Sequence, residues 1–347
     1  MTTPRTANGT RSANGTGRVL IALGGNAMTG PDGSATPDAQ RAAVAVAMEA
    51  VADLIVSGVD VVLTHGNGPQ VGNLLVKNEL TAHVVPPVTL DWCGAQTQGT
   101  LGFTVVSALE AALRRRGQPA RVAAVVTRTL VDPADPAFEH PTKPVGRHLP
   151  QAEAERFVAL GQHWEDRGAK GWRRVVPSPN PLEVVDAPAI RTLVAAGFTT
   201  VAAGGGGIPV VRDADGAERG VEAVLDKDLT AALLAASVDA DVLVIATDVP
   251  NAMLDYGTAN QRELGRVTPE ELRGHAAAGQ FAGGSMGPKV EAAVRFVEAG
   301  GRRSVITSLD RITAAVAGEA GTVVEANPVA AVEAIAAAAP AVAADAG

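Results

Sequence analysis

The sequence predicts an α/β fold in which a mostly parallel central sheet is covered by helices on both faces. The first observation is a set of continuous apolar runs, such as 18–23 and 241–247, which are typical of buried parallel strands. The second is that glycine-rich loops and segments with helical periodicity follow such runs repeatedly. The third is size, because 347 residues with 46% hydrophobic content are enough for a sizeable core and two lobes. This alternation is the pattern of βαβ units.

Composition and charge exclude several classes of protein. The net charge of −8 argues against a sequence-independent nucleic-acid binder, because such binding depends on cations that neutralise phosphates. The sequence has no run of 18 apolar residues and no signal-peptide core, which predicts a soluble protein without a membrane partner. Cys93 is the single cysteine, so an intramolecular disulfide is excluded. A reducing cytoplasm suits this composition, and we expect a cytoplasmic protein.

The first part of the chain predicts two strand–loop–helix units. Strand 18–23 ends at Gly24-Gly25-Asn26, and the helix after it closes at Gly58. Strand 59–64 ends in a loop that contains Gly66-Asn67-Gly68. Such loops lie at the carboxyl ends of strands, where open α/β sheets bind ligands and helix N-termini favour anions. Neither loop matches the common nucleotide fingerprints.

His65, which lies between the second strand and its glycine turn, has two interpretations. It could be a general base, but a histidine beside a glycine turn is more often a backbone hydrogen-bonder. A long apolar run, 121–131, predicts the next strand.

A change of composition marks an insert at 132–176, which is rich in proline and polar residues. We expect it to protrude from the sheet as a stiff flap, because prolines limit the flexibility of a segment. Lys143 lies in it between Pro141 and Pro144. In one interpretation the insert is a mobile lid that delivers Lys143 and excludes water. In the other it is a rigid prop of a dimer, on which Lys143 is solvated.

The second lobe is organised around the stretch 199–234. A short apolar strand precedes four consecutive glycines, Gly204 to Gly207, whose N–H groups can approach an anion without interference from a Cβ. Asp226-Lys227-Asp228 then opens a helix, where a cation stands between two carboxylates. There are also simpler interpretations. The glycines could form a flexible loop, and Asp226 or Asp228 could be the N-cap of the helix.

A further glycine-rich loop leads into Pro288 and Lys289 at the start of another helix. A lysine in the first turn opposes the helix dipole, so its presence there favours a functional anion partner. Strand 241–247 ends at Asp248, and the runs 304–309 and 321–325 are predicted to complete the sheet.

Several long motifs together resemble the carbamate kinases of the amino-acid kinase superfamily. The resemblance covers roughly residues 18–326 in register. It is carried by the segments 22–27, 65–73, 131–135, 141–146, 171–179, 204–211, 220–228 and 284–289. It implies a three-layer αβα sandwich with a small protruding subdomain, and a homodimer. The implied reaction is reversible phosphoryl transfer between ATP, with Mg²⁺, and carbamate, giving ADP and carbamoyl phosphate. The implied use is ATP formation in arginine breakdown.

The resemblance also implies roles for individual residues. The residues matching the family's catalytic groups are Lys227, Lys289, Lys143 and Asp228. The expected substrate-binding residues are Gly24, Gly25, Asn26, Gly66, Asn67, Gly68, Gly205 and Gly206. The expected nucleotide-binding residues are Asp226, Asp248, Tyr256, Met286 and Lys289. No protein ligand to a metal is implied, because Mg²⁺ is expected to enter on the phosphates of ATP.

The predicted organisation and the alternatives follow from these assignments. The predicted divisions are a disordered arm, an acceptor lobe that includes the insert, a nucleotide-binding lobe and a flexible tail, at 1–17, 18–185, 186–327 and 328–347. The alternatives are another acid kinase of the superfamily and a non-catalytic anion-binding or storage protein. Kinases of larger carboxylates usually carry lysine at the position of Ala22, which favours carbamate. Retention of the lysines favours an enzyme.

Overall fold

The computed structural model describes residues 17–30, 32–281 and 286–326. Nearly all of the predicted arm and the whole predicted tail lie outside the described residues. So do residues 283–285 of the glycine-rich loop that precedes Pro288.

A central sheet of eight strands forms the middle of the described structure, in the order β15-β17-β16-β12-β1-β2-β9-β3. Neighbouring strands are parallel except for the pair β16 and β17. The strands are β1 (Arg18–Leu23), β2 (Asp60–His65), β3 (Val122–Ala124), β9 (Thr199–Val201), β12 (Val242–Thr247), β15 (Arg266–Val267), β16 (Arg303–Ser308) and β17 (Thr322–Val324). The predicted mostly parallel sheet is therefore confirmed.

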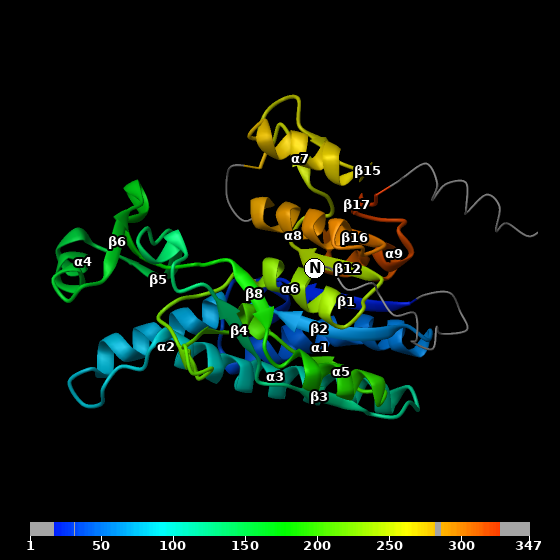
Figure 1. The fold of residues 1–347 in the computed structure, drawn as a ribbon, viewed down its shortest axis with the longest axis horizontal. Helices are drawn as coiled ribbons and strands as arrows, with labels where there is room; N and C mark the ends of the chain where they lie inside the picture. Colours follow the sequence, from blue (N-terminus) through cyan, green and yellow to red (C-terminus); the bar gives the residue numbers. More distant parts are fainter. Residues whose placement is uncertain (1–16, 31, 282–285, 327–347) are drawn as a thin grey trace, which may run out of the picture.

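Helices cover both faces of this sheet, and alternate residues of β1 belong to different cores. Ile21 packs with one group of helices, whereas Leu20 and Ala22 pack with the other. The first group comprises α1 (Pro37–Val56), α3 (Leu90–Arg115) and α9 (Ile312–Ala317). The second comprises α5 (Ala187–Ala195), α6 (Lys227–Ser237), α7 (Pro269–Ala277) and α8 (Met286–Glu298). This is a three-layer αβα sandwich, and in Figure 1 the strands of its central sheet follow one another from β15 near the top to β3 near the bottom.

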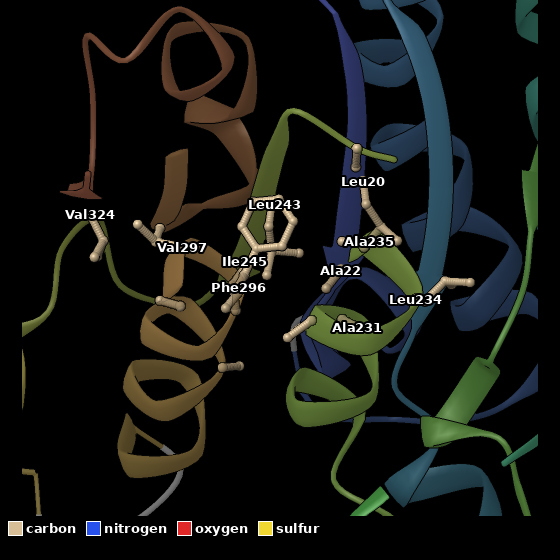
Figure 2. Packing of buried hydrophobic residues seen from close by; sticks show 14 of the residues in the cluster. Leu20, Ala22, Ala231, Leu234, Ala235, Leu243, Ile245, Phe296, Val297 and Val324 are labelled. Atoms are coloured by element: carbon tan, nitrogen blue, oxygen red, sulfur yellow. The ribbon is translucent and has the colours of Figure 1, made fainter. Parts of the chain in front are cut away.

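Small side chains let the second group of helices approach the sheet closely. Figure 2 shows Ala231 and Ala235 of α6 facing Ala22 of β1, while Phe296 of α8 lies against Ile245. Close packing of this kind fixes the start of α6 relative to the strand ends, because a tightly packed interior resists displacement.

A smaller sheet lies beside the central one, in the order β11-β10-β4-β8. Its strands are β4 (Arg128–Val131), β8 (Pro181–Val184), β10 (Ile208–Arg212) and β11 (Glu218–Gly220). A short hairpin pairs β13 (Met253–Leu254) with β14 (Arg262–Glu263). Short 3₁₀ helices are η1 (Gly25–Met28), η2 (Pro136–Phe138), η3 (Gly168–Lys170), η4 (Gly204–Gly206) and η5 (Leu309–Arg311).

One predicted strand, 121–131, is wrong, because this run divides into β3 of the central sheet and β4 of the smaller sheet. The chain leaves the central sheet after Ala124, and Thr127 turns inward, where its N–H donates to Gln98 Oε1 (2.7 Å). The Thr127 hydroxyl oxygen also accepts a hydrogen bond from the N–H of Ala203 (3.0 Å). Contacts with residues so distant in sequence leave no trace in the local apolar pattern.

The insert forms a three-stranded antiparallel sheet with a helix, and projects from the body in Figure 1. Its elements are β5 (Lys143–Leu149), α4 (Gln151–Val158), β6 (His163–Asp166) and β7 (Trp172–Val176). It has a small core of its own around Leu149, Ala154 and Trp164. Its base packs through Val145 and Val176 against the body, where α2 (Gly68–Thr81) and α3 meet.

The division of the chain into two lobes at 185/186 stays a prediction. β9 and α5 follow this boundary in sequence, yet β9 lies between β2 and β3 in the sheet. Among the described residues, no helix combines the length and apolar character that crossing a membrane requires.

Candidate active site

Three loops meet at one end of the central sheet because they follow three adjacent parallel strands. β1 is followed by Gly24 and Gly25, β2 by Gly66 and Asn67, and β9 by the glycines of η4. The first residue of α6, Lys227, lies at the same place. A cavity of about 320 Å³ opens there. It is lined by Gly25, Gly66, Asn67, Gly68, Pro69, Lys143, Pro144, Val145, Gly205, Val224, Leu225, Asp226, Lys227, Asp228, Pro288 and Lys289.

A buried cluster of two lysines and one carboxylate forms the floor of this site. Lys227 Nζ donates to Asp228 Oδ1 at 2.5 Å, and Lys289 Nζ donates to Asp228 Oδ2 at 3.1 Å. Asp228 is 2% exposed and Lys289 is 6% exposed. Burial by itself raises the pKa of Asp228, but the charges and hydrogen bonds of the two lysines hold its pKa below the usual value. The cluster keeps one net positive charge beside the cavity.

The start of α6 explains how this cluster is positioned. Asp226 is the N-cap of the helix, with an extended backbone, and its Oδ1 accepts a hydrogen bond from the N–H of Asp228 at 3.0 Å. The N-cap interpretation is therefore correct for Asp226. Lys227 and Asp228 consequently occupy the first turn, and both side chains face the cavity.

A second ion pair joins the insert to the body at the edge of the same cavity. Lys143 Nζ donates to Asp226 Oδ2 at 2.8 Å. The Lys143 side chain is 37% exposed, whereas that of Asp226 is 13% exposed. The insert thus places its lysine within reach of whatever occupies the cavity.

The glycines of η4 are required because side chains occupy the space that a Cβ would need. A Cβ on Gly205, whose φ is +68°, would lie 2.1 Å from Asn67 Nδ2. A Cβ on Gly204 would lie 2.5 Å from the ring of His65. Asn67 is held there because its Nδ2 donates to Thr97 Oγ1 at 2.9 Å. Close packing of two loops is thus one reason for this glycine run.

Some backbone N–H groups expected to bind substrate are already used within the protein. The N–H of Gly66 donates to the carbonyl of Leu23 (3.0 Å), and that of Gly206 donates to Ala203 (2.9 Å). Gly206 is buried and, with Gly24, is not among the residues that line the cavity in the described part of the chain. Asn26 belongs to η1.

His65 is a buried hydrogen-bonder at the end of β2, 2% exposed. Its Nδ1 lies 2.9 Å from the carbonyl oxygen of Gly66, to which it donates. Burial, together with the charge of Lys227, lowers the pKa of His65, although the contact with Gly66 opposes this. Burial therefore favours the neutral form of the ring, which contacts the loop that follows β2.

The residues expected at the nucleotide divide into two groups. Asp226 and Lys289 line the cavity, whereas Asp248, Tyr256 and Met286 are not among its described lining residues. Asp248 is exposed at the end of β12, and Tyr256 is 74% exposed. Met286 begins the described part of α8 and packs against the core beside the sheet.

Sequence reasoning missed the apolar walls of the cavity and the supports of its polar groups. The walls include Pro69, Pro144, Val145, Val224, Leu225 and Pro288. Thr97 holds Asn67, while Gln98 Nε2 donates to the carbonyl oxygen of Gly204 at 3.2 Å. Gln98 precedes a glycine in α3, but the local sequence does not indicate that its partner is Gly204, 106 residues away.

The chain is similar to known proteins over most of its length. A model of the amino acid kinase family matches residues 17–308. The carbamate kinase of Thermococcus kodakarensis is 47% identical over 311 residues, covering 88% of this chain and 98% of that protein. The carbamate kinase of Pyrococcus horikoshii is 45% identical over 310 residues, with coverage of 88% and 98%. The structure of Giardia lamblia carbamate kinase bound to AMP-PNP matches with a TM-score of 0.84 and 41% identity, covering 89% of this chain and 98% of that one.

The chain therefore belongs to the amino acid kinase family. Its relatives in that family at 45–47% identity are carbamate kinases, as is the Giardia lamblia structure that shares its fold.

Proposed function

We propose that the protein is a carbamate kinase, which transfers a phosphoryl group reversibly between ATP and carbamate. The observation that carries the proposal is the Lys227–Asp228–Lys289 cluster at the cavity, in a chain whose relatives are carbamate kinases. Two largely buried ammonium groups held by one carboxylate are suited to a migrating phosphoryl group, since its negative charge needs preorganised cations.

The proposed step needs little covalent participation by the protein. A carbamate oxygen forms a bond to the γ-phosphorus while the bond from that phosphorus to the bridging oxygen breaks, and ADP leaves with the electron pair. Lys227 and Lys289 stabilise the charge on the transferring group and the bridging oxygen. Asp228 holds both ammonium groups in place, and Lys143 approaches from the insert side.

The glycine loops complete the proposed site on both sides. Gly25, Gly66, Asn67 and Gly68 border the place proposed for carbamate, with Gly24 and Asn26 next to them in sequence. Gly205 and Gly206 adjoin the phosphates. For the nucleotide we propose that Lys289 contacts the phosphates and that Asp226 acts there through its partner Lys143. Asp248, Tyr256 and Met286 would lie farther out.

Magnesium would be held by the phosphates of the nucleotide rather than by the protein, and would supply additional neutralising charge. The carboxylates at the cavity fit this arrangement, because each of their four oxygens already faces a donor. Asp228 faces two lysines, and Asp226 faces Lys143 and the N–H of Asp228.

Ala22 is fully buried in β1 against the α6 core, so this position supplies no charge. Other members of the superfamily, which phosphorylate larger carboxylates, usually carry lysine at this position, whereas in this chain Lys143 or Lys227 would supply the charge. We therefore propose carbamate rather than glutamate or acetylglutamate as the acceptor.

We also propose a homodimer formed through α3 and the edge strand β3. Trp92 and Phe103 of α3 are 61% and 68% exposed, and Val126 beyond β3 is 58% exposed. A groove of about 1010 Å³ that includes Phe103 runs along the same helix. These apolar side chains would be covered by a second copy. Sedimentation of the protein and of Phe103→Glu tests this, and a monomeric native protein would contradict it.

A cytoplasmic location and a part in arginine breakdown complete the proposal. The cytoplasmic location is supported by the cysteine content, because the single cysteine, Cys93, is buried and free. The second rests on the resemblance alone.

The experiment that tests the proposed activity is a coupled assay of ATP formation. With Mg²⁺, ADP and carbamoyl phosphate, the protein should form ATP continuously. In the reverse direction, glutamate, acetylglutamate and UMP should not serve as acceptors. Comparable turnover with any of these three would assign the protein to another kinase of the superfamily, and no turnover at all would favour an anion-binding protein.

A further inference from the structure

The two carboxylate oxygens of Asp226 have different partners on different parts of the molecule. Oδ1 accepts the N–H of Asp228 and so caps α6, the helix that carries Lys227. Oδ2 accepts Lys143 Nζ, which belongs to the first residue of β5 in the insert. One side chain therefore connects the catalytic helix to the insert.

From this geometry we propose that Asp226 is a positioning residue, which holds the Lys143 ammonium group over the cavity in register with Lys227. The inference rests on the proposed function, which assigns Lys143 to the phosphoryl group. An ammonium group has three N–H donors, so Lys143 can keep one on Asp226 and direct the others into the cavity. Without this anchor a four-carbon side chain has many rotamers, and fixing it in advance lowers the cost of reaching the transition state.

The surroundings of Lys143 support an anchor that is specific to this residue. In the part of the chain that the structure describes, Asp226 is the carboxylate in ion-pair contact with Lys143. Two other ion pairs join the insert to the body, Arg147 with Glu79 and Arg174 with Glu222, and none of these four side chains lines the cavity. Attachment of the insert is thus shared among several contacts, whereas placement of the lysine depends on one.

The substitution Asp226→Asn separates the two roles of this side chain. Asparagine is about as good an N-cap as aspartate, so the cap on α6 is retained. The negative charge that holds Lys143 is lost. We expect kcat for ATP formation to fall about 10-fold, as for a displaced group that acts in the transition state. The KM for carbamoyl phosphate should not rise, because the site gains one net positive charge.

Glu79→Gln is the matched control. The Arg147–Glu79 pair also joins the insert to the body, and its side chains are 44% and 15% exposed, close to the 37% and 13% of Lys143 and Asp226. This substitution should leave kcat unchanged. An equal fall in kcat in both variants would mean that any loosening of the insert has this effect, which would overturn a specific role for Asp226.

A double-mutant cycle with Lys143→Met gives the sharpest result. If Asp226 acts through Lys143, the double mutant should have the same kcat as Lys143→Met alone. Independent, multiplicative effects would overturn the inference while leaving carbamate kinase activity in place. A native protein without turnover would instead refute the proposed function.

Reductive methylation followed by mass spectrometry tests the anchor without turnover. Lys143 should react faster in Asp226→Asn than in the native protein, relative to the exposed Lys170 in the same insert. Equal relative rates would show that Asp226 does not hold Lys143.

Discussion

Two ion-pair clusters meet at the cavity, and they differ in burial and in the parts of the protein that they join. Lys227, Asp228 and Lys289 belong to α6 and α8, and their side chains are between 3% and 14% exposed. The pair of Lys143 with Asp226 joins the insert to the body, and its lysine is 37% exposed. A buried cluster is costly to disturb, whereas a solvated pair contributes little to stability. The first cluster therefore fixes two cations in place, while the second holds a cation whose remaining N–H groups can reach a substrate.

The largest expected effect on stability comes from Asp228→Asn. This change leaves Lys227 and Lys289 without their shared carboxylate in a buried place. We expect the free energy of unfolding to fall by about 3–5 kcal/mol, as when one partner of a buried ion pair is removed. Urea unfolding measures it. A midpoint equal to that of the native protein would mean that the cluster is better solvated than the structure indicates.

The catalytic role of the buried cluster is tested by the substitutions Lys289→Ala and Lys227→Ala. Turnover in either variant should fall by about 10²-fold or more, since preorganised electrostatic groups have effects of this size. A solvated lysine could be removed without changing the melting temperature, but Lys289 is 6% exposed and paired with Asp228. We therefore expect Lys289→Ala to lower the melting temperature as well. Near-normal turnover in Lys289→Ala would show that this lysine has a structural role and no catalytic one.

Lys143→Ala should affect activity without affecting stability, in contrast to the buried lysines. The pair with Asp226 is partly exposed, so its loss should cost no more than about 1 kcal/mol. Turnover should fall while ADP binding, measured by calorimetry, stays unchanged. Weaker ADP binding would place Lys143 on the nucleotide side.

Hydrogen exchange distinguishes a lid from a rigid prop. Backbone amides in 132–176 should gain protection when ADP and a carbamoyl phosphate analogue bind together. The base of the insert is packed through Val145 and Val176, so the gain should be larger beyond these residues. Unchanged exchange throughout, with native turnover in Lys143→Ala, would favour the prop.

His65 should affect how the stability of the protein depends on pH. Its pKa is lowered from 6.5 in the folded protein, mainly by burial, so the unfolded chain binds its proton first as pH falls. Stability should therefore decrease below about pH 6.5, by at most about 1.4 kcal/mol per pH unit for one proton. His65→Gln should flatten this slope in urea unfolding, whereas the exposed His83→Gln should not. An unchanged slope in His65→Gln would place the titrating group elsewhere.

The parts predicted best were those that depend on local sequence. The run 18–23 became β1 with the same bounds, because a strand buried on both faces needs a continuous apolar segment. The alternation of strands and glycine loops predicted the end of the sheet at which the cavity opens. The resemblance assigned Lys227, Lys289 and Asp228 together, and the structure brings these three side chains into contact.

The parts missed depend on contacts between distant residues. The Lys143–Asp226 pair joins residues 83 positions apart, and its geometry depends on how the insert packs on α2 and α3. The same limit applies to Gly205, whose lack of a side chain is required by Asn67 in another loop. Neither periodicity nor composition records which loops will meet, so these details follow only from the folded structure.

The most direct test of the account is the rate of ATP formation from ADP and carbamoyl phosphate, with Mg²⁺, by the native protein and by Asp228→Asn. The assay should be made below the melting temperature of the variant, so that both proteins are folded. The account predicts continuous turnover by the native protein and a kcat lower by about 10²–10³-fold in the variant, because both lysines lose their position. Similar turnover by the two folded proteins would contradict it.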